Sequence, residues 1–123
     1  MSRQATVPFD RQDQFDQIRS GLLDGEQIIA VYDAVGVGTG FIGLTDRRVI
    51  LQDKSFVGKR VAITSIPYSK ITSVSVLSNK SWAGQFFSSG SIALHTSGQT
   101  YEVEMRGNQK AQHVHNVILY YLH

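Results

Sequence analysis

The sequence of 123 residues contains no cysteine, so neither disulfide bonds nor thiolate metal ligands contribute to its structure. Long apolar runs are also missing. The longest are residues 28–32 and 117–122, and both fall far short of the ~20 residues that cross a bilayer. The N-terminal residues carry Arg, Gln and Asp throughout and lack the apolar core of a signal peptide. We therefore expect a cytoplasmic protein without a membrane span.

A large excess of charge of one sign is absent as well. Lys and Arg together number 12 and Asp and Glu number 10, and the net charge of +2 is too small to predict a nucleic-acid partner. What the chain does have is a hydrophobic fraction of 41%, which is typical of a globular protein. Its length suits one domain with an ordinary core, so we predict a single domain over residues 1–123.

The N-terminal part of the chain combines a polar start with a short helical pattern. We expect residues 1–8 to form a loose tail and Asp10 to act as the N-cap of a helix over residues 11–23. Phe15 and Ile18 follow helical spacing in that stretch.

The C-terminal part has a longer helical pattern over residues 108–122, with Asn108 as the predicted cap. Apolar and polar side chains separate onto opposite sides of this helix, as in a helix that lies on a core. The apolar side consists of Ala111, Val114, Ile118, Tyr121 and Leu122.

Between these helices, residues 26–106 have the texture of strands joined by short turns. Seven strands are predicted, over residues 26–34, 41–45, 48–52, 61–66, 71–77, 91–96 and 99–106. No helix alternates with them, which argues against a parallel α/β sheet, and consecutive hairpins favour a bent sheet or barrel. The predicted fold is mostly β (α+β), with the C-terminal helix covering an open end of the barrel.

Two loops contain the candidate contact residues. The loop over residues 81–89 is small and polar except for Trp82, Phe86 and Phe87, which either form an exposed contact site or fold back over the core. A second loop contains Lys54, Lys59 and Arg60, which either touch an anionic surface or are solvated at the end of a hairpin.

No pattern of catalytic or metal-binding residues is present. No serine lies in a Gly-x-Ser-x-Gly elbow, and no two of the histidines at positions 95, 113, 115 and 123 have the i, i+4 spacing of a helical metal site. We interpret Asp46-Arg47-Arg48 as a tight turn with solvated arginines rather than as a reactive cluster. The sequence thus predicts a non-enzymatic protein with no catalytic, cofactor-binding or metal-binding residues.

Four short strings resemble a known family. They are Gly25-Glu26, the run Leu44-Thr45-Asp46-Arg47-Arg48-Val49-Ile50-Leu51, the pair Gly58-Lys59, and Ser65-Ile66-Pro67-Tyr68-Ser69-Lys70-Ile71. With the predicted seven strands and final helix, the chain resembles the bacterial pleckstrin-homology (PH) domains of the PH-like barrel superfamily over about residues 22–122.

The resemblance implies a PH-like barrel of about seven antiparallel strands in two bent sheets, with an N-terminal helix and a capping C-terminal helix. It also implies a binding or scaffolding module and assembly of identical subunits into rings. Eukaryotic relatives bind phosphoinositides through basic residues between the first two strands. The equivalent stretch here, residues 35–40, contains no basic residue, which argues against that route.

Two hypotheses about function follow. The first is a module that acts through protein contacts, including self-association into a homo-oligomer, because the strand over residues 71–77 contains neither charge nor proline to protect it if it lies at a sheet edge. The alternative is a peripheral membrane-binding domain that makes weak contact with anionic lipid through the basic loop and inserts the aromatic residues. The sequence does not identify the partner.

Overall fold

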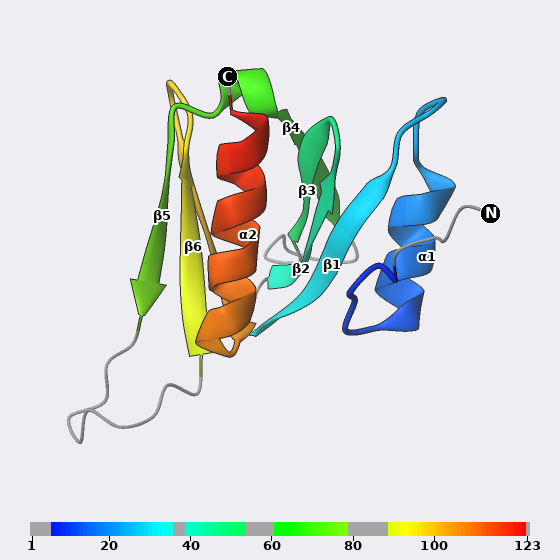
Figure 1. Cartoon of the computed structure of the whole chain (residues 1–123), viewed down its shortest axis with the longest axis horizontal. Helices are drawn as coiled ribbons and strands as arrows, with labels where there is room; N and C mark the ends of the chain where they lie inside the picture. Colours follow the sequence, from blue (N-terminus) through cyan, green and yellow to red (C-terminus); the bar gives the residue numbers. More distant parts are fainter. Residues whose placement is uncertain (1–5, 36–38, 54–60, 79–88, 123) are drawn as a thin grey trace.

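The computed structural model describes residues 6–35, 39–53, 61–78 and 89–122. Two helices and a short 3-10 turn accompany seven strands (Figure 1). In chain order the elements are α1 (Gln12–Ser20), β1 (Ile28–Val35), β2 (Thr39–Thr45), β3 (Arg48–Asp53), β4 (Ala62–Pro67), η1 (Tyr68–Lys70), β5 (Ser73–Ser78), β6 (Ser89–His95), β7 (Thr100–Arg106) and α2 (Asn108–Tyr121). The predicted number and order of elements are confirmed, with strand ends shifted by at most two residues.

The strands form one antiparallel sheet in the order β4-β3-β2-β1-β7-β6-β5. β1 belongs to both halves of the sheet, since its first part pairs with β2 and its last residues, Ala34 and Val35, pair with β7. The two predicted bent sheets are therefore continuous through β1. β4 and β5 are the two ends of this order in the described part of the chain, so the barrel is open and β5 is an edge strand, which is the condition that the self-association hypothesis required.

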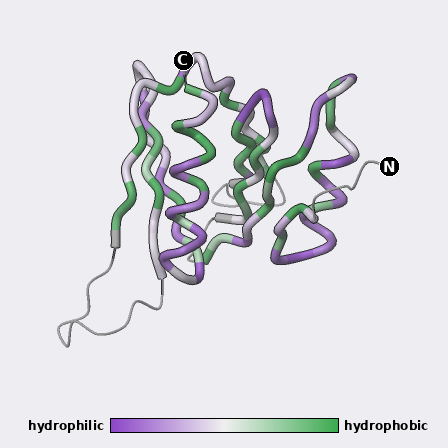
Figure 2. Tube along the Cα trace, viewed as in Figure 1, coloured by the Kyte–Doolittle hydropathy of each residue, from purple (hydrophilic) through white to green (hydrophobic). Residues whose placement is uncertain are grey.

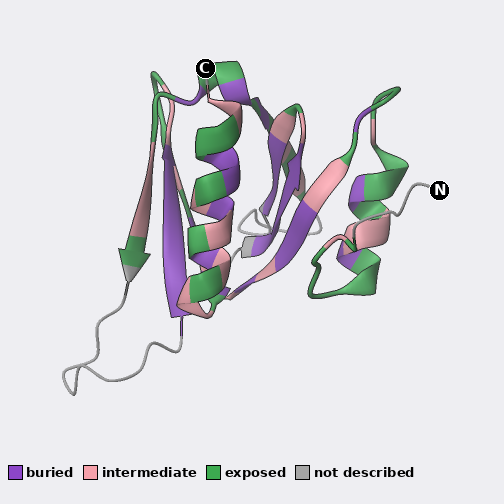
Figure 3. Ribbon diagram, in the orientation of Figure 1, coloured by how far each residue is buried: buried purple, intermediate pink, exposed green. Residues whose placement is uncertain are grey.

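The main core lies between the inner face of the sheet and α2. Strand alternation places Ile42 and Leu44 of β2 on this face, where they belong to one core cluster with Ala111, Val114 and Ile118 of α2. Figure 3 shows the buried side of α2 turned toward the strands and its opposite side exposed. The predicted inner side of the final helix is confirmed, although Tyr121 and Leu122 are only partly buried against the core.

α1 lies on the opposite, outer face of the β1–β2–β3 part of the sheet. Its Ile18 packs with Val31, Phe41 and Ile50 in a second, smaller core. The tube coloured by hydropathy shows α1 as a largely polar helix, in contrast to the apolar strands beneath it (Figure 2). α1 thus covers the outer face of the β1–β2–β3 part of the sheet, whereas α2 packs on β5, β6 and β7 from the opposite, inner face.

Both predicted helix caps are wrong. α1 begins at Gln12 rather than at residue 11 and ends at Ser20 rather than at 23, and the residue at its N-cap position is Arg11, without a side-chain cap. α2 begins with Asn108 itself, and the residue at its N-cap position is Gly107, whose φ of 96° suits a residue without Cβ. Asp10 and Asn108 have side chains that are common at N-caps, but neither residue occupies the N-cap position of its helix.

The end of the stretch predicted as a loose tail, residues 1–8, is hydrogen-bonded to β1, whereas residues 1–5 are not among those that the structure describes. The carbonyl of Pro8 accepts a hydrogen bond from the Val31 amide (3.1 Å), and the Asp10 amide donates to the Val31 carbonyl (3.1 Å). Phe9 forms a parallel bridge to Val31. These contacts use the edge of β1 that β7 leaves unpaired, because β7 meets only the last residues of β1.

Candidate functional site

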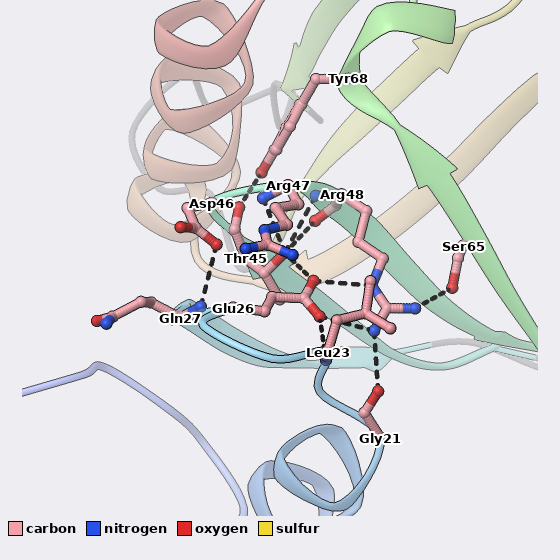
Figure 4. Close-up of polar contacts among 10 residues, drawn as sticks. All are labelled: Gly21, Leu23, Glu26, Gln27, Thr45, Asp46, Arg47, Arg48, Ser65 and Tyr68. Carbon is pink, nitrogen blue, oxygen red and sulfur yellow. Dashed lines mark hydrogen bonds and ion pairs between the residues drawn. The ribbon is translucent and has the colours of Figure 1, made fainter.

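The most strongly held polar group in the described chain is an ion pair between Glu26 and Arg48. The Arg48 guanidinium donates from Nε to Glu26 Oε2 (2.8 Å) and from Nη2 to Glu26 Oε1 (2.9 Å), which is a bidentate arrangement (Figure 4). The Glu26 side chain is fully buried and that of Arg48 is 19% exposed. Arg48 also donates from Nη2 to the carbonyl of Gly21, where α1 ends (3.0 Å), and from Nη1 to Ser65 Oγ on β4 (2.9 Å).

Thr45 connects this ion pair to the β2–β3 turn. Its hydroxyl donates to Glu26 Oε2 (2.6 Å) and accepts from the backbone amides of Arg47 (3.1 Å) and Arg48 (3.0 Å). Tyr68 anchors the same position from η1, since its hydroxyl donates to the Thr45 carbonyl (2.7 Å). The network therefore joins α1, the start of β1, the β2–β3 turn and β4.

The Glu26 carboxylate remains ionised at neutral pH. Hydrogen bonding from Arg48 lowers the pKa of Glu26 to about 2, and it outweighs burial, which acts in the opposite direction. Hydrogen bonding to Glu26 correspondingly raises the pKa of Arg48. Because both groups are charged and already paired, they suit a structural junction rather than proton transfer. The prediction of solvated arginines is wrong for Arg48 and right for Arg47, which is exposed.

A groove of about 290 Å³ opens beside this junction, on the outer side of the sheet. Its apolar lining consists of Ile18 of α1, Phe41 of β2, Ile50 of β3 and Ile63 of β4. Its polar lining consists of Gln17, Ser20, Gly21, Arg48 and Ser65. An apolar floor with a few polar groups at one end is the usual character of a binding groove.

The β4 side of the groove is open to solvent and combines Ser65 with an exposed apolar side chain, that of Ile63. Ile63 is 48% exposed, and Val61, directly before β4, is 49% exposed. Outward residues of a strand at a solvated sheet face are normally polar. The sequence did not reveal this site, because the alternation of residues 61–66 predicted a strand without showing that α1 would stop short of its outer face.

A second polar cluster ties α2 to β1 on the other side of the sheet. Tyr32 Oη lies 2.6 Å from Nδ1 of His113, and the Lys110 ammonium pairs with the Asp10 carboxylate (2.7 Å). Burial, assisted by the charge of Asp10, raises the pKa of the Tyr32 phenol. Each of these polar groups has a hydrogen-bonding or charged partner within the cluster. We therefore infer that the cluster holds the N-terminal segment and α2 against β1.

The described histidines each have a different partner, and that of His113 is Tyr32. His95 contacts Thr100 on β7, whereas His115 contacts its neighbour Asn116 on α2. Across residues 6–35, 39–53, 61–78 and 89–122, no group of three or more His, Asp or Glu side chains is arranged to hold a metal ion. In the same residues, neither helix combines the length and the apolar character needed to span a membrane.

Comparison with known proteins fits this geometry. The sequence pattern described as "Bacterial PH domain" matches residues 22–119 of the chain. The chain belongs to the bacterial PH domain family. Among solved structures, it is similar to a DUF1696-family protein with a pleckstrin-homology domain from Shewanella loihica PV-4, with a TM-score of 0.68 and 23% identity over 93% of this chain and 95% of that one. The curated proteins contain no match.

Membership in the bacterial PH domain family explains the four strings that suggested it. Glu26, Thr45, Arg48 and Tyr68 come from three of those strings and meet in the one hydrogen-bonded network. In this chain, residues from three of the strings therefore hold the start of β1, the β2–β3 turn and η1 together. α1 lies outside residues 22–119, so the groove combines a family element, β4, with a helix that precedes the family match.

The residues predicted as contact sites are not among those that the structure describes. Lys54, Lys59 and Arg60 belong to the connection between β3 and β4, and Trp82, Phe86 and Phe87 to the connection between β5 and β6. The glycines at 36 and 38 in the β1–β2 connection are likewise outside the described residues. The role of these side chains stays a prediction.

Proposed function

We propose that this bacterial PH domain is a non-enzymatic protein-binding module that self-associates, with the edge strand β5 at the contact. The observation that carries the proposal is the place of β5 at one end of the sheet order, combined with its sequence Ser-Val-Ser-Val-Leu-Ser, which has no charge and no proline. Natural edge strands usually contain a charged residue or a proline, which prevents them from pairing with other chains. The absence of charge and proline from β5 favours pairing of this strand with a strand of another chain.

The surroundings of β5 support a protein partner. Leu77 near the end of the strand is exposed, and α2, which packs beside β5, exposes Leu119 and Tyr120. Backbone hydrogen bonds from an edge strand and apolar area from neighbouring side chains together are the usual basis of strand addition. The chain after β5 also contains Trp82, Phe86 and Phe87, which we propose as part of the contact.

Assembly of identical subunits is the form of binding that the edge favours most directly. A symmetric homo-oligomer lets each copy bury the same edge without forming an open fibre. The β1–β2 connection has no basic residue, so phosphoinositide binding by the route of eukaryotic PH domains is not part of the proposal.

Analytical ultracentrifugation of the wild type over micromolar concentrations tests the proposal, and we expect a defined oligomer. Leu77→Lys places a charge on the edge strand and should weaken assembly, whereas Gln99→Lys, in the exposed β6–β7 connection, adds the same charge elsewhere and should not. The triple variant with Ala at positions 82, 86 and 87 tests the aromatic loop. Circular dichroism confirms that each variant is folded.

A wild type that stays monomeric overturns self-association. A Leu77→Lys variant that keeps full assembly removes β5 from the contact. Sedimentation with vesicles, with and without anionic lipid, tests the membrane alternative that Lys54, Lys59 and Arg60 suggest. Binding to anionic vesicles by a monomeric wild type would replace the present proposal with that alternative.

A further inference from the structure

The outer face of the β1–β4 half of the sheet is covered by one helix where there is room for two. α1 packs mainly over β1 and β2, and its Ile18 reaches Ile50 of β3 but no residue of β4 in the same cluster. Packed helices lie about 8–10 Å apart and strands about 4.8 Å apart, so the next helix position is roughly two strands further on, over β3 and β4. The groove and the exposed Val61 and Ile63 lie at that position. The groove thus has the place and the apolar surface that a second helix would need.

The lining of the groove determines the chemistry of an occupant. Arg48 is the one charged side chain in the described lining, and Glu26 balances its charge. At the rim, Arg48 Nη1 and Ser65 Oγ lie together and offer hydrogen-bonding groups to an incoming polar atom (Figure 4). The occupant is therefore a helix with an apolar, uncharged contact face and one polar atom that reaches this rim, since a charge buried there would be left without a partner.

The outer face of α2 has this chemistry. Its exposed residues are Gln109, Gln112, Asn116, Leu119 and Tyr120, with no charge among them, and Leu119 is 50% and Tyr120 71% exposed. The Tyr120 ring packs edge-on against Tyr121 (4.9 Å between centroids), so it is partly held in place. Large, pre-positioned tyrosines are among the residues that contribute most to protein interfaces. The exposed residues of α1, in contrast, are all polar or charged, so α1 does not meet the requirement.

We propose that the groove between α1 and β4 docks the outer face of α2 from a second copy of this chain. Leu119 and Tyr120 of the incoming helix cover Ile63 and the groove floor, and the Tyr120 hydroxyl meets Arg48 and Ser65. α1 and α2 lie on opposite faces of the sheet, so the donating and accepting surfaces are different. Each copy then donates α2 to one neighbour and accepts α2 from another, in a ring if the rotation closes.

This inference rests on the proposed self-association and adds the surface that accepts the neighbour. α2 packs beside β5, so the donating surface is continuous with the proposed edge contact. The accepting surface lies along β4, the other end of the sheet order. A failure of this contact alone leaves the β5 proposal standing.

The absence of cysteine from the chain permits a direct test. Ile63→Cys and Tyr120→Cys are prepared separately, one with a mass tag, then mixed under mild oxidation. We expect a mixed disulfide dimer that forms several-fold faster than the dimer from Ile63→Cys mixed with Gln99→Cys, an exposed control position on the β6–β7 connection. Both test positions are exposed, so the substitutions should leave the fold intact.

Sedimentation of two further variants tests the energetics. Tyr120→Ala and Ile63→Asp should each weaken assembly about tenfold or more, as expected for a central interface residue. Thr100→Asp, at an exposed position on β7, is the control for the added charge. An assembling wild type with no preferential cross-link, and with unchanged affinity in both variants, overturns the α2–groove contact. A monomeric wild type overturns it together with self-association.

Discussion

Replacing Glu26 with Gln tests whether the Glu26–Arg48 pair stabilises the fold through its charge. The pKa of Glu26 falls from an ordinary 4.5 to about 2 in the folded protein, mainly because of hydrogen bonding from Arg48. At about 1.4 kcal/mol per pH unit, this difference corresponds to about 3 kcal/mol of folding free energy at neutral pH. Loss of one partner of a buried ion pair typically costs a similar amount, about 3–5 kcal/mol.

The sign of the pH dependence follows from the direction of the pKa. A carboxyl group whose pKa is lowered by folding stabilises the protein above the pKa of the unfolded chain, and this stabilisation is lost as the pH falls through the folded pKa. The contribution of Glu26 is therefore complete above about pH 5 and disappears toward pH 2. Between pH 7 and pH 3 the wild type should lose about 2 kcal/mol from this group alone.

Urea unfolding followed by circular dichroism, at pH 7 and pH 3, measures both effects. Glu26→Gln should be less stable than the wild type by about 3 kcal/mol at pH 7 and by about 1 kcal/mol at pH 3. Glu102→Gln, at an exposed position on β7, controls for the loss of one carboxylate and should differ little from the wild type at either pH. An equal deficit for Glu26→Gln at both pH values would refute the reasoning, because the loss would then not depend on the charge.

Three further results are expected. Ile118→Ala should lower the free energy of unfolding by about 2–5 kcal/mol, because Ile118 is fully buried, whereas Leu119→Ala at the half-exposed next position should cost well under that in thermal or urea unfolding. Gly90→Ala should cost about 1–3 kcal/mol, because its Cβ would lie 3.0 Å from the α2 backbone, while Gly98→Ala has free space and serves as the control. A chelator should leave the melting temperature unchanged, and a lowered value would show that a metal binds the native state.

The order of elements could be predicted because each one has a local signature. Alternation in residues 71–77 and 99–106 requires one buried face, and the helical stripe of Val114 and Ile118 requires a surface to lie on. Such patterns depend only on residues that are close in the sequence and on whether one side of the element faces a core. Which strand lies at a sheet edge could not be predicted, and the sheet order shows that β5, over residues 73–78, is one of the two end strands.

Partners that are distant in the chain could not be assigned from these patterns. The arginine of the β2–β3 turn looked solvated, because its carboxylate partner is Glu26, 22 positions earlier and buried by the fold itself. Asp10 has the side chain of a helix cap, yet it pairs with Lys110, 100 positions later. In both cases the side chain pairs with an oppositely charged group that is distant in the sequence. Solvent was the expected surrounding of Arg48, and a helix start was the expected partner of Asp10.

The sequence by itself determined the class of fold, the seven strands and the apolar side of α2, because hydrophobic periodicity acts over a few residues. Tertiary structure alone decided where coverage of the sheet stops. α1 ends at Ser20 and leaves the outer side of β4 open, so Ile63 lines a groove instead of a core. Whether an apolar residue is buried depends on which element packs above it, and that is settled only when the whole chain has folded.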